Sequence, residues 1–332
     1  MPRSPEARGG EEAAARAGRR QGMLLAAPAA VYLLIFFVVP LGLITVYSFA
    51  TRTVTGRTSL SDWNIDAYRS VGDEIVVGII WRSGWLATLT TALCLVIGYP
   101  FAYYIATRPR SLRAILLVLV MIPFWTNGLV RVYAIRFLLG SNGPASTLSE
   151  SLGFGAFRIL FTPTAVTIGM VYTFLTFMVL PLYVALERMD WRLAEAARDL
   201  YANGAKAFWK VTLPLTRSGI VAGCVLVFVP SFGSYVVPDI LGGAKTLLVG
   251  SYIAQQFSDA RNRPLGAALS VLLIVAMLIA VALNQRSGSG AENSDDAGSD
   301  RPRRRRRGAD TDADSSSGSE AETRTEPAPA GL

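Results

Sequence analysis

Residues 195–215 read EAARDLYANGAKAFWKVTLPL and form a charged, helix-forming stretch within a strongly apolar part of the chain. The run 159–186 before this stretch carries no charged residue, and the run 218–241 after it carries only Asp239. A membrane protein with a structured loop outside the bilayer explains why a charged stretch lies between two such apolar runs.

The stretch is predicted to form a hairpin over residues 190–215. Asp190 is suited to cap the start of a first helix, whose apolar residues recur at helical spacing. Asn203-Gly204 is typical of a helix end, where glycine tolerates the left-handed conformation. A second short helix is expected to end at Leu213-Pro214. The apolar stripe of the first helix comprises Leu193, Ala196, Ala197 and Leu200.

The composition of the 332 residues also indicates a membrane protein. Hydrophobic residues make up 52% and charged residues 17%, whereas roughly a quarter of the residues are charged in soluble domains. Histidine is absent, which removes the commonest general base and metal ligand. Cys94 and Cys224 lie in apolar runs and predict neither a disulfide framework nor a zinc site. The net charge of +8 comes mainly from arginines that flank apolar runs or cluster in the tail, so it does not indicate nucleic-acid binding.

Six segments are long and apolar enough to cross about 30 Å of hydrocarbon, which takes roughly 20 residues in a helix. The first is too long for a cleaved signal peptide and is expected to remain as an anchor. The predicted fold class is an all-α membrane protein with a six-span domain over residues 23–284. The spans cover about residues 23–49, 83–107, 114–139, 161–186, 218–241 and 264–284.

Arginine and lysine are concentrated in alternate connections, and this bias places those connections in the cytoplasm. The N-terminal segment 1–22, the hairpin 190–215 and the tail 285–332 all fall on that side, so both termini are predicted to be cytoplasmic. The tail is polar and charged and is expected to be disordered. Its block Arg303–Arg307 is explained by positive-inside anchoring or by contact with anionic membrane lipid.

The physics of the hairpin leaves two partners open for it. An amphipathic loop on the lipid surface fits the aromatic pair Phe208-Trp209, which lies between Lys206 and Lys210. A helix that docks on another protein fits the small residues of the first helix, which permit close approach. These small residues are Ala194, Ala196 and Ala197.

The spacing within the hairpin matches a known motif. Six residues separate Glu195-Ala196-Ala197 from Gly204, and eight separate Gly204 from Leu213-Pro214. This pattern resembles the EAA loop of ABC importer permeases. Four further segments are similar to the first permease subunit of spermidine/putrescine importers, and the likeness covers roughly residues 23–284. They are YPFAYYIATRP (99–109), MIPFWTNGLVRVYA (121–134), MVLPLYVALERMD (178–190) and PLGAALS (264–270).

The resemblance implies a type I ABC importer permease bundle in a prokaryotic inner or plasma membrane, paired with a second EAA-type permease. In such importers an extracytoplasmic solute-binding protein delivers the solute. The EAA loop docks in a groove of a cytoplasmic ABC ATPase dimer, which uses ATP and Mg²⁺. The residues implied to couple this chain to the ATPase are Glu195, Ala196, Ala197, Asp199, Gly204, Leu213 and Pro214.

The chain is expected to be a transport subunit rather than an enzyme, and to bind no cofactor or metal of its own. The segment LGGAKT (241–246) is superficially similar to a phosphate-binding loop. However, Ala244 separates Gly243 from Lys245, so the required G-x-x-x-x-G-K-[ST] is absent. ATP hydrolysis is therefore expected on a partner chain.

Charged and aromatic residues near the external ends of the spans are candidates for the solute pathway. Asp239 is expected to attract a polyamine cation, and the aromatic rings offer cation–π faces. Arg131 does not suit a cation path and is interpreted as a partner of Asp239 or as a contact of the binding protein. Interfacial aromatic anchors and a snorkelling arginine explain the same residues. The candidates are Trp125, Arg131, Tyr133, Tyr172, Tyr235 and Asp239.

Several alternatives stay open at the level of sequence. The same machinery could import iron(III), thiamine, sulfate or a phosphonate, because selectivity rests largely on a separate binding protein. The permease pair could be a homodimer or a heterodimer. An ion-gradient-driven carrier would not need the EAA loop, and an intramembrane enzyme is disfavoured by the lack of histidine and of metal-ligand spacing.

Overall fold

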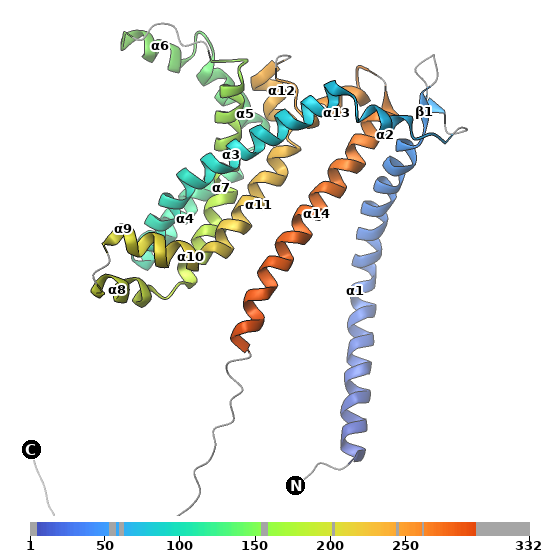
Figure 1. Cartoon of the computed structure of the whole chain (residues 1–332). Coiled ribbons are helices and arrows are strands. Elements are labelled where there is room, and N and C mark those ends of the chain that lie inside the picture. The colour runs from blue at the N-terminus through green and yellow to red at the C-terminus, as the bar shows by residue number, and fades with distance from the viewer. Residues whose placement is uncertain are drawn as a thin grey trace, which may run out of the picture. The chain divides into compact units, whose positions relative to one another are not determined.

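The computed structural model describes residues 5–52, 58–59, 63–153, 159–200, 203–243, 246–260 and 262–296. Over this part of the chain the fold is almost entirely helical (Figure 1). Two short strands, β1 (Thr51–Arg52) and β2 (Thr58–Ser59), pair antiparallel. The helices are α1 (Pro5–Ser48), α2 (Asp66–Ser70), α3 (Glu74–Ala106), α4 (Arg110–Trp125), α5 (Gly128–Leu139), α6 (Pro144–Ser151), α7 (Pro163–Arg188), α8 (Trp191–Asp199), α9 (Gly204–Ala207), the π-helix η1 (Phe208–Thr212), α10 (Leu213–Leu215), α11 (Arg217–Phe232), α12 (Val236–Gly242), α13 (Val249–Phe257) and α14 (Arg263–Asp296).

The core is a bundle of α3, α7 and α11, which make the most extensive helix–helix contacts in the described chain. Small residues let these helices approach closely, as is usual between membrane helices. A Cβ placed on Gly219 of α11 would lie 2.4 Å from the Cβ of Ala185 in α7. A Cβ on Gly223 would lie 2.8 Å from the sulfur of Met178. A larger residue at either glycine would therefore force α11 away from α7.

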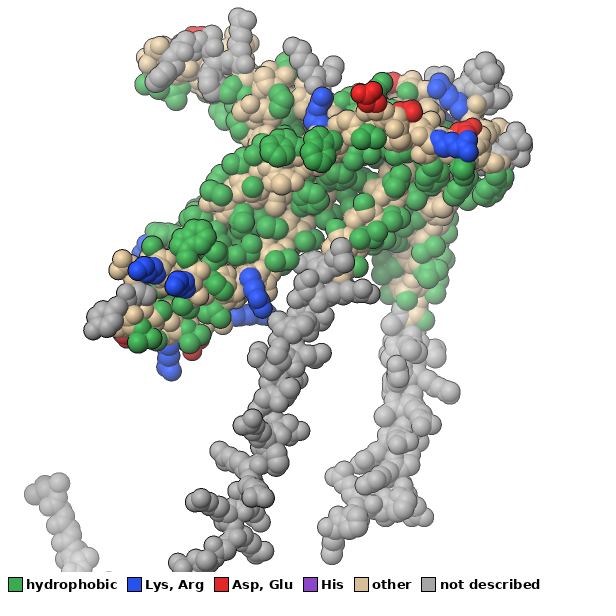
Figure 2. All heavy atoms as spheres, viewed as in Figure 1, with side chains coloured by type: hydrophobic (Ala, Val, Ile, Leu, Met, Phe, Trp, Pro, Cys, Tyr) green, Lys and Arg blue, Asp and Glu red, His purple; other side chains and the backbone are tan. Residues whose placement is uncertain are grey.

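By length and composition, four described helices can cross a membrane, or up to six if each of two bent pairs forms one span. The four are α1, α3, α7 and α14. One bent pair is α4 with α5–α6, at 90°, and the other is α9–α10 with α11, at 67°. Figure 2 shows apolar side chains over the middle of the visible face and charged side chains toward its two ends, as expected for a protein that crosses a bilayer.

The predicted third span, 114–139, is divided by a sharp break at Thr126-Asn127. The side chain of Asn127 accepts a hydrogen bond of 2.8 Å from the backbone of α5 and caps that helix. The guanidinium of Arg131 donates to the carbonyl oxygens of Pro123 and, at 3.1 Å, Thr126. Side chains thus satisfy backbone groups that the break leaves without helical partners.

Helix α1 is apolar, and its side chains from residue 27 onward are largely exposed. Lipid or another protein must therefore cover this helix.

The C-terminal region is described only in part. Helix α14 continues to Asp296. The rest of the tail that is predicted to be disordered, residues 297–332 with the block Arg303–Arg307, lies outside the described residues. Ala244 and Lys245 of the LGGAKT segment do as well.

Candidate coupling hairpin and solute pathway

The hairpin begins immediately after α7, where Met189 and Asp190 adopt extended conformations and turn the chain. The carboxylate of Asp190 accepts a hydrogen bond of 3.0 Å from the backbone nitrogen of Arg192. This interaction satisfies one of the free N–H groups at the start of α8, and it confirms the predicted cap. The inward face of α8 carries Trp191, Ala194 and Ala197, of which Ala194 is buried.

The opposite face of α8 is exposed in the described part of the chain. Leu193 and Ala196 are exposed, and so is Leu200, which directly follows α8, continues this free face and is 80% exposed. Most of the predicted apolar stripe therefore points away from the bundle. Glu195 and Asp199 are exposed as well. An apolar patch bordered by charged groups on a short helix is typical of an interaction surface.

The structure corrects the predicted role of Gly204. Sequence reasoning placed it in a left-handed turn at the end of a helix, but Gly204 is the first residue of α9 and Asn203 takes the capping position before it. Positive φ angles among the described residues occur only at Phe161, Gly153 and Gly243. The first helix also ends earlier than expected, at Asp199, and residues 201–202 lie outside the described part.

The second arm of the hairpin continues into the bundle with one bend. Helices α9, η1 and α10 follow each other directly and end at Leu215, so Leu213-Pro214 lies in the last turn of this arm, as predicted. The axis then bends by 67° before α11. At this bend the hydroxyl of Thr216 donates to the carbonyl oxygen of Thr212 at 2.9 Å.

An aromatic cluster of Tyr99, Tyr103, Trp191 and Phe208 joins the hairpin to the end of α3. The ring centroid of Tyr103 lies 5.6 Å from that of Trp191 and 6.1 Å from that of Phe208. The rings of Tyr99 and Phe208 meet edge to face at 5.4 Å. The hydroxyl of Tyr99 is also 2.9 Å from that of Thr216. Because the Thr216 hydroxyl already donates to Thr212, the Tyr99 hydroxyl donates in this buried pair.

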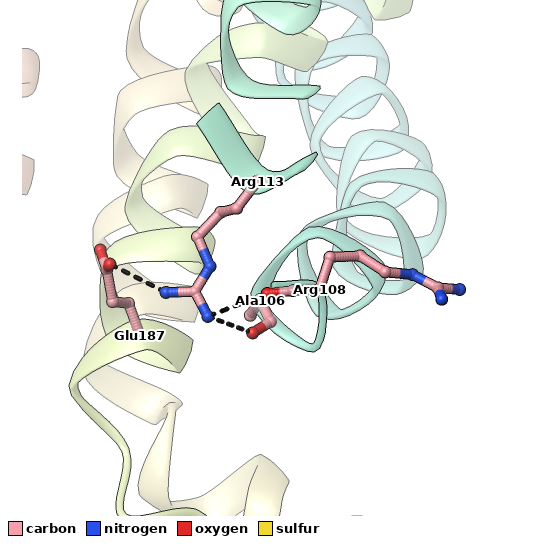
Figure 3. A network of polar contacts seen from close by, with 4 residues as sticks. All are labelled: Ala106, Arg108, Arg113 and Glu187. Atoms are coloured by element: carbon pink, nitrogen blue, oxygen red, sulfur yellow. Dashed lines mark hydrogen bonds and ion pairs between the residues drawn. The ribbon is translucent and has the colours of Figure 1, made fainter. Parts of the chain in front are cut away.

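Arg113 ties the same end of α3 to α4 and α7 (Figure 3). One guanidinium nitrogen lies 3.1 Å from a carboxylate oxygen of Glu187, in the last turn of α7. The other donates to the carbonyl oxygens of Ala106 at 2.9 Å and Arg108 at 3.3 Å. These carbonyls lie at the C-terminal end of α3, where backbone acceptors lack helical partners. Helices α3, α4 and α7 are therefore held together at one point, next to the residue at which the hairpin begins.

Replacing Arg113 with glutamine is expected to lower the free energy of unfolding by about 1–2 kcal/mol, because it removes three polar contacts. Replacing Glu187 with glutamine removes one contact of a side chain that is 46% exposed, so a loss below about 1 kcal/mol is expected. Thermal unfolding of the purified variants measures both effects. An equal loss in the two variants would show that the carbonyl contacts of Arg113 contribute nothing.

The structure brings together only two of the predicted pathway residues. Arg131 and Tyr172 line one groove of about 490 Å³, whose remaining lining is mostly apolar. Tyr133 lines a different groove of about 410 Å³, together with Arg136. Trp125, Tyr235 and Asp239 are exposed and line neither of these two grooves.

The predicted pairing of Arg131 with Asp239 is wrong. Both residues are described, and no ion pair joins them. Arg131 instead donates to the carbonyl oxygens freed at the break between α4 and α5. The sequence could not show this arrangement, because the break itself was not predicted. Asp239 lies in the first turn of α12 and leaves its carboxylate exposed.

Comparison with known proteins identifies the family of this chain. The family described as "Binding-protein-dependent transport system inner membrane component" matches residues 95–288. The spermidine/putrescine transport system permease protein PotB of Haemophilus influenzae is 42% identical over 258 residues, which cover 77% of this chain and 90% of that protein. This chain belongs to the family of binding-protein-dependent transport system inner membrane components. The permease also shares 41% identity with PotB of Escherichia coli K12 over 248 residues, 74% of the chain and 90% of the relative.

Solved structures confirm the fold of the permease. A bacterial ABC transporter involved in the import of the acidic polysaccharide alginate matches with a TM-score of 0.58 at 17% identity, over 81% of this chain and 96% of that one. The alginate transporter in complex with its pentasaccharide-bound periplasmic protein matches with a TM-score of 0.60 at 16% identity, over 82% and 94%. The predicted ABC permease fold is confirmed, and the permease is a transport subunit like its relatives rather than an enzyme.

Sequence reasoning missed the residues that hold the hairpin in place. Tyr99 and Tyr103 lie four residues apart near the end of α3 and therefore share one helix face. That spacing was the available signal, but the partner of the face was not predictable. From the sequence, Arg113 is predicted only to help set the membrane topology as a basic residue between two spans, and no role is predicted for Glu187. Opposite charges at neighbouring span ends on one predicted side were the signal for this pair.

Proposed function

We propose that the permease imports polyamines, with spermidine and putrescine as the first candidates. Its identity of 42% to a spermidine/putrescine permease extends over 90% of that protein, which supports a common cargo. Sulfate and phosphonates are anions, unlike the polyamines in the name of that relative. Iron(III) and thiamine are the other alternative cargoes, and the uptake assay below tests both.

The proposed topology has six spans, in which each bent pair of helices counts as one span. Both termini and the hairpin then lie in the cytoplasm, and α12 and the start of α3 lie on the external side. The relatives named as inner membrane components support a location in the prokaryotic inner membrane. The proposed partners are a second EAA-type permease, a cytoplasmic ABC ATPase dimer and an extracytoplasmic solute-binding protein.

We further propose that α8 docks in a groove of the ATPase. The observation that carries this proposal is the division of α8 into a face attached to the bundle and a free face with Leu193, Ala196 and Leu200. The free side also exposes Glu195 and Asp199, and α8 exposes Arg192 and Arg198 as well, so its charges balance and do not select for an anionic lipid surface. The cytoplasmic leaflet is negatively charged and attracts clusters of basic residues instead.

The contacts of the hairpin explain how movement of α8 would reach the bundle. Trp191 at the start of α8 and Phe208 in the second arm contact the same residue, Tyr103 of α3. The hairpin and the end of α3 should therefore move as one body. An ATPase that binds one orientation of the hairpin more tightly shifts the permease toward the corresponding state. The hydrolysis of ATP takes place on that partner.

ATP-dependent uptake of radiolabelled spermidine into proteoliposomes tests the proposed function. The vesicles contain the permease pair, the ATPase and the binding protein. We expect uptake with ATP, none with a non-hydrolysable analogue, and competition by putrescine. ATP-dependent uptake of iron(III) or thiamine by the same vesicles, with no spermidine uptake, would refute the proposed cargo while leaving the ABC mechanism intact.

Asp239→Asn is expected to raise the KM for spermidine severalfold, because the exposed carboxylate would attract a polycation at the external side. The maximal rate should change little, since Asp239 is not attached to the hairpin. Asp259→Asn, at an exposed acid after α13, serves as the matched control. Unchanged spermidine uptake by Asp239→Asn would remove this residue from the solute pathway.

A further inference from the structure

Arg82 is a cation on α3, a helix long and apolar enough to span a membrane. Its side chain is exposed and makes no ion pair or hydrogen bond within the described chain. At about 1.5 Å per residue, Arg82 lies about 36 Å along α3 from the end of that helix at Ala106. This distance falls between the hydrocarbon thickness of about 30 Å and the full bilayer thickness of about 40–45 Å. If α3 ends at the cytoplasmic interface, Arg82 lies among the headgroups of the opposite leaflet.

Arg82 stands at the polar end of a groove of about 720 Å³ between α3 and α7. Thr164 and Thr246 also line the groove, and the hydroxyl of Thr246 has no hydrogen-bond partner among the described residues. Thr164 lies in the first turn of the long helix α7, whose free N–H groups add positive potential. This end of the groove therefore suits an anion with hydrogen-bond acceptors.

The other lining of the groove is apolar apart from Thr167, and its leucines extend along α3. Leu86, Leu89 and Leu93 follow Arg82 on the same side of the helix. The distance along α3 from Arg82 to Leu93 is about 16 Å, and one leaflet of hydrocarbon is about 15 Å thick. The groove thus has a cationic end at headgroup level and an apolar wall as long as one leaflet.

We propose that this groove binds one phospholipid of the extracytoplasmic leaflet. Its phosphate contacts the guanidinium of Arg82, and an acyl chain lies along the three leucines. A polyamine does not fit the groove, because Arg82 repels a cation. The assignment of the leaflet rests on the proposed topology. Lipid binding is measured without transport, so a failure of this inference and a failure of the proposed function can be distinguished.

Native mass spectrometry of the purified, delipidated permease complex tests the proposal, with phosphatidylglycerol as the probe. We expect one lipid to bind more tightly than the rest, and Arg82→Gln to weaken that first binding event about tenfold, as expected for a lost charge-assisted contact. Arg69→Gln is the matched control, since Arg69 is exposed and pairs with Asp66 at 3.6 Å. Equal affinity in the wild type and Arg82→Gln would overturn the proposal.

A second variant tests the apolar wall. Leu89→Trp fills the groove and should also abolish the tight binding event, whereas Val96→Trp, at an exposed position of α3 outside the groove, should not. Gel filtration confirms that each variant complex is assembled. A third variant, Leu89→Cys, tests for a protein occupant: a disulfide to an engineered cysteine in the second permease would show that a helix fills the groove, and would also overturn the proposal.

Discussion

Gly204→Asp is expected to lower ATP-driven uptake at least tenfold while leaving the permease folded and inserted. Gly204 is exposed, and a Cβ at this position would meet no atom of the chain within 4 Å. Its φ is not positive, so the backbone does not require glycine. We therefore propose that the ATPase occupies the space next to Gly204. A carboxylate forced into that interface would cost several kcal/mol, which is more than the 1.4 kcal/mol of a tenfold effect.

The variant is best compared with Ser111→Asp, which adds the same charge at an exposed position in the first turn of α4. Aspartate is favourable in the first turn of a helix, so near-normal uptake is expected there. Glu195→Lys should behave like Gly204→Asp, because it reverses an exposed charge on α8. Spermidine uptake, membrane insertion and ATPase binding are measured for each variant. A stably inserted Gly204→Asp variant that bound the ATPase and transported at the normal rate would refute the docking of this surface.

Phe208→Ala is expected to lower transport without weakening the docking of α8 on the ATPase. Phe208 is half-buried and contacts both Tyr99 and Tyr103 of α3. Core replacements of phenylalanine by alanine cost about 3–5 kcal/mol, so about 2 kcal/mol is expected at this half-buried position. The free face of α8 is unchanged, and the ATPase should still bind. Movement of the hairpin would no longer be transmitted fully to α3, so uptake per ATP hydrolysed should decrease severalfold.

Two variants control for the loss of an aromatic ring. Phe208→Leu retains most of the buried volume and should restore most of the uptake. Trp209→Ala removes the neighbouring ring, which is 66% exposed. Among the described aromatic rings Trp209 contacts only Phe208, so its removal should change stability little. The ratio of spermidine transported to ATP hydrolysed is the deciding measurement. A normal ratio in Phe208→Ala would show that the aromatic cluster stabilises the hairpin without transmitting its movement.

The sequence predicted the features of this permease that depend on local patterns. Apolar runs of sufficient length gave the helices α3, α7 and α14, and the cap at Asp190 needed only the nature of that residue and its neighbours. The position of the EAA residues on a helix followed in the same way. The burial of individual residues was not predicted: in the apolar stripe of α8, Leu193 and Leu200 are exposed, whereas Ala197 is partly buried.

Features that depend on contacts between distant segments could not be predicted. The bend at Thr126-Asn127 is stabilised by Arg131, for which pairing with Asp239 was one of two interpretations from the sequence. The conformation of Gly204 depends on where α8 ends and α9 begins, and an Asn-Gly pair is compatible with either a helix end or a helix start. The contacts of Tyr99 with Phe208 and Thr216 join residues more than 100 positions apart, at 117 positions for the hydroxyl pair.

The most direct test of the account is photo-crosslinking from Leu200 on the free face of α8. A photoreactive benzoylphenylalanine is placed at this position in native membranes, and the covalent adduct is identified by mass spectrometry. The account predicts an adduct with an ABC ATPase subunit whose yield changes when ATP is added, and no such adduct from the control position Ser111. Adducts with phospholipid alone would contradict it and would assign the hairpin to the membrane surface.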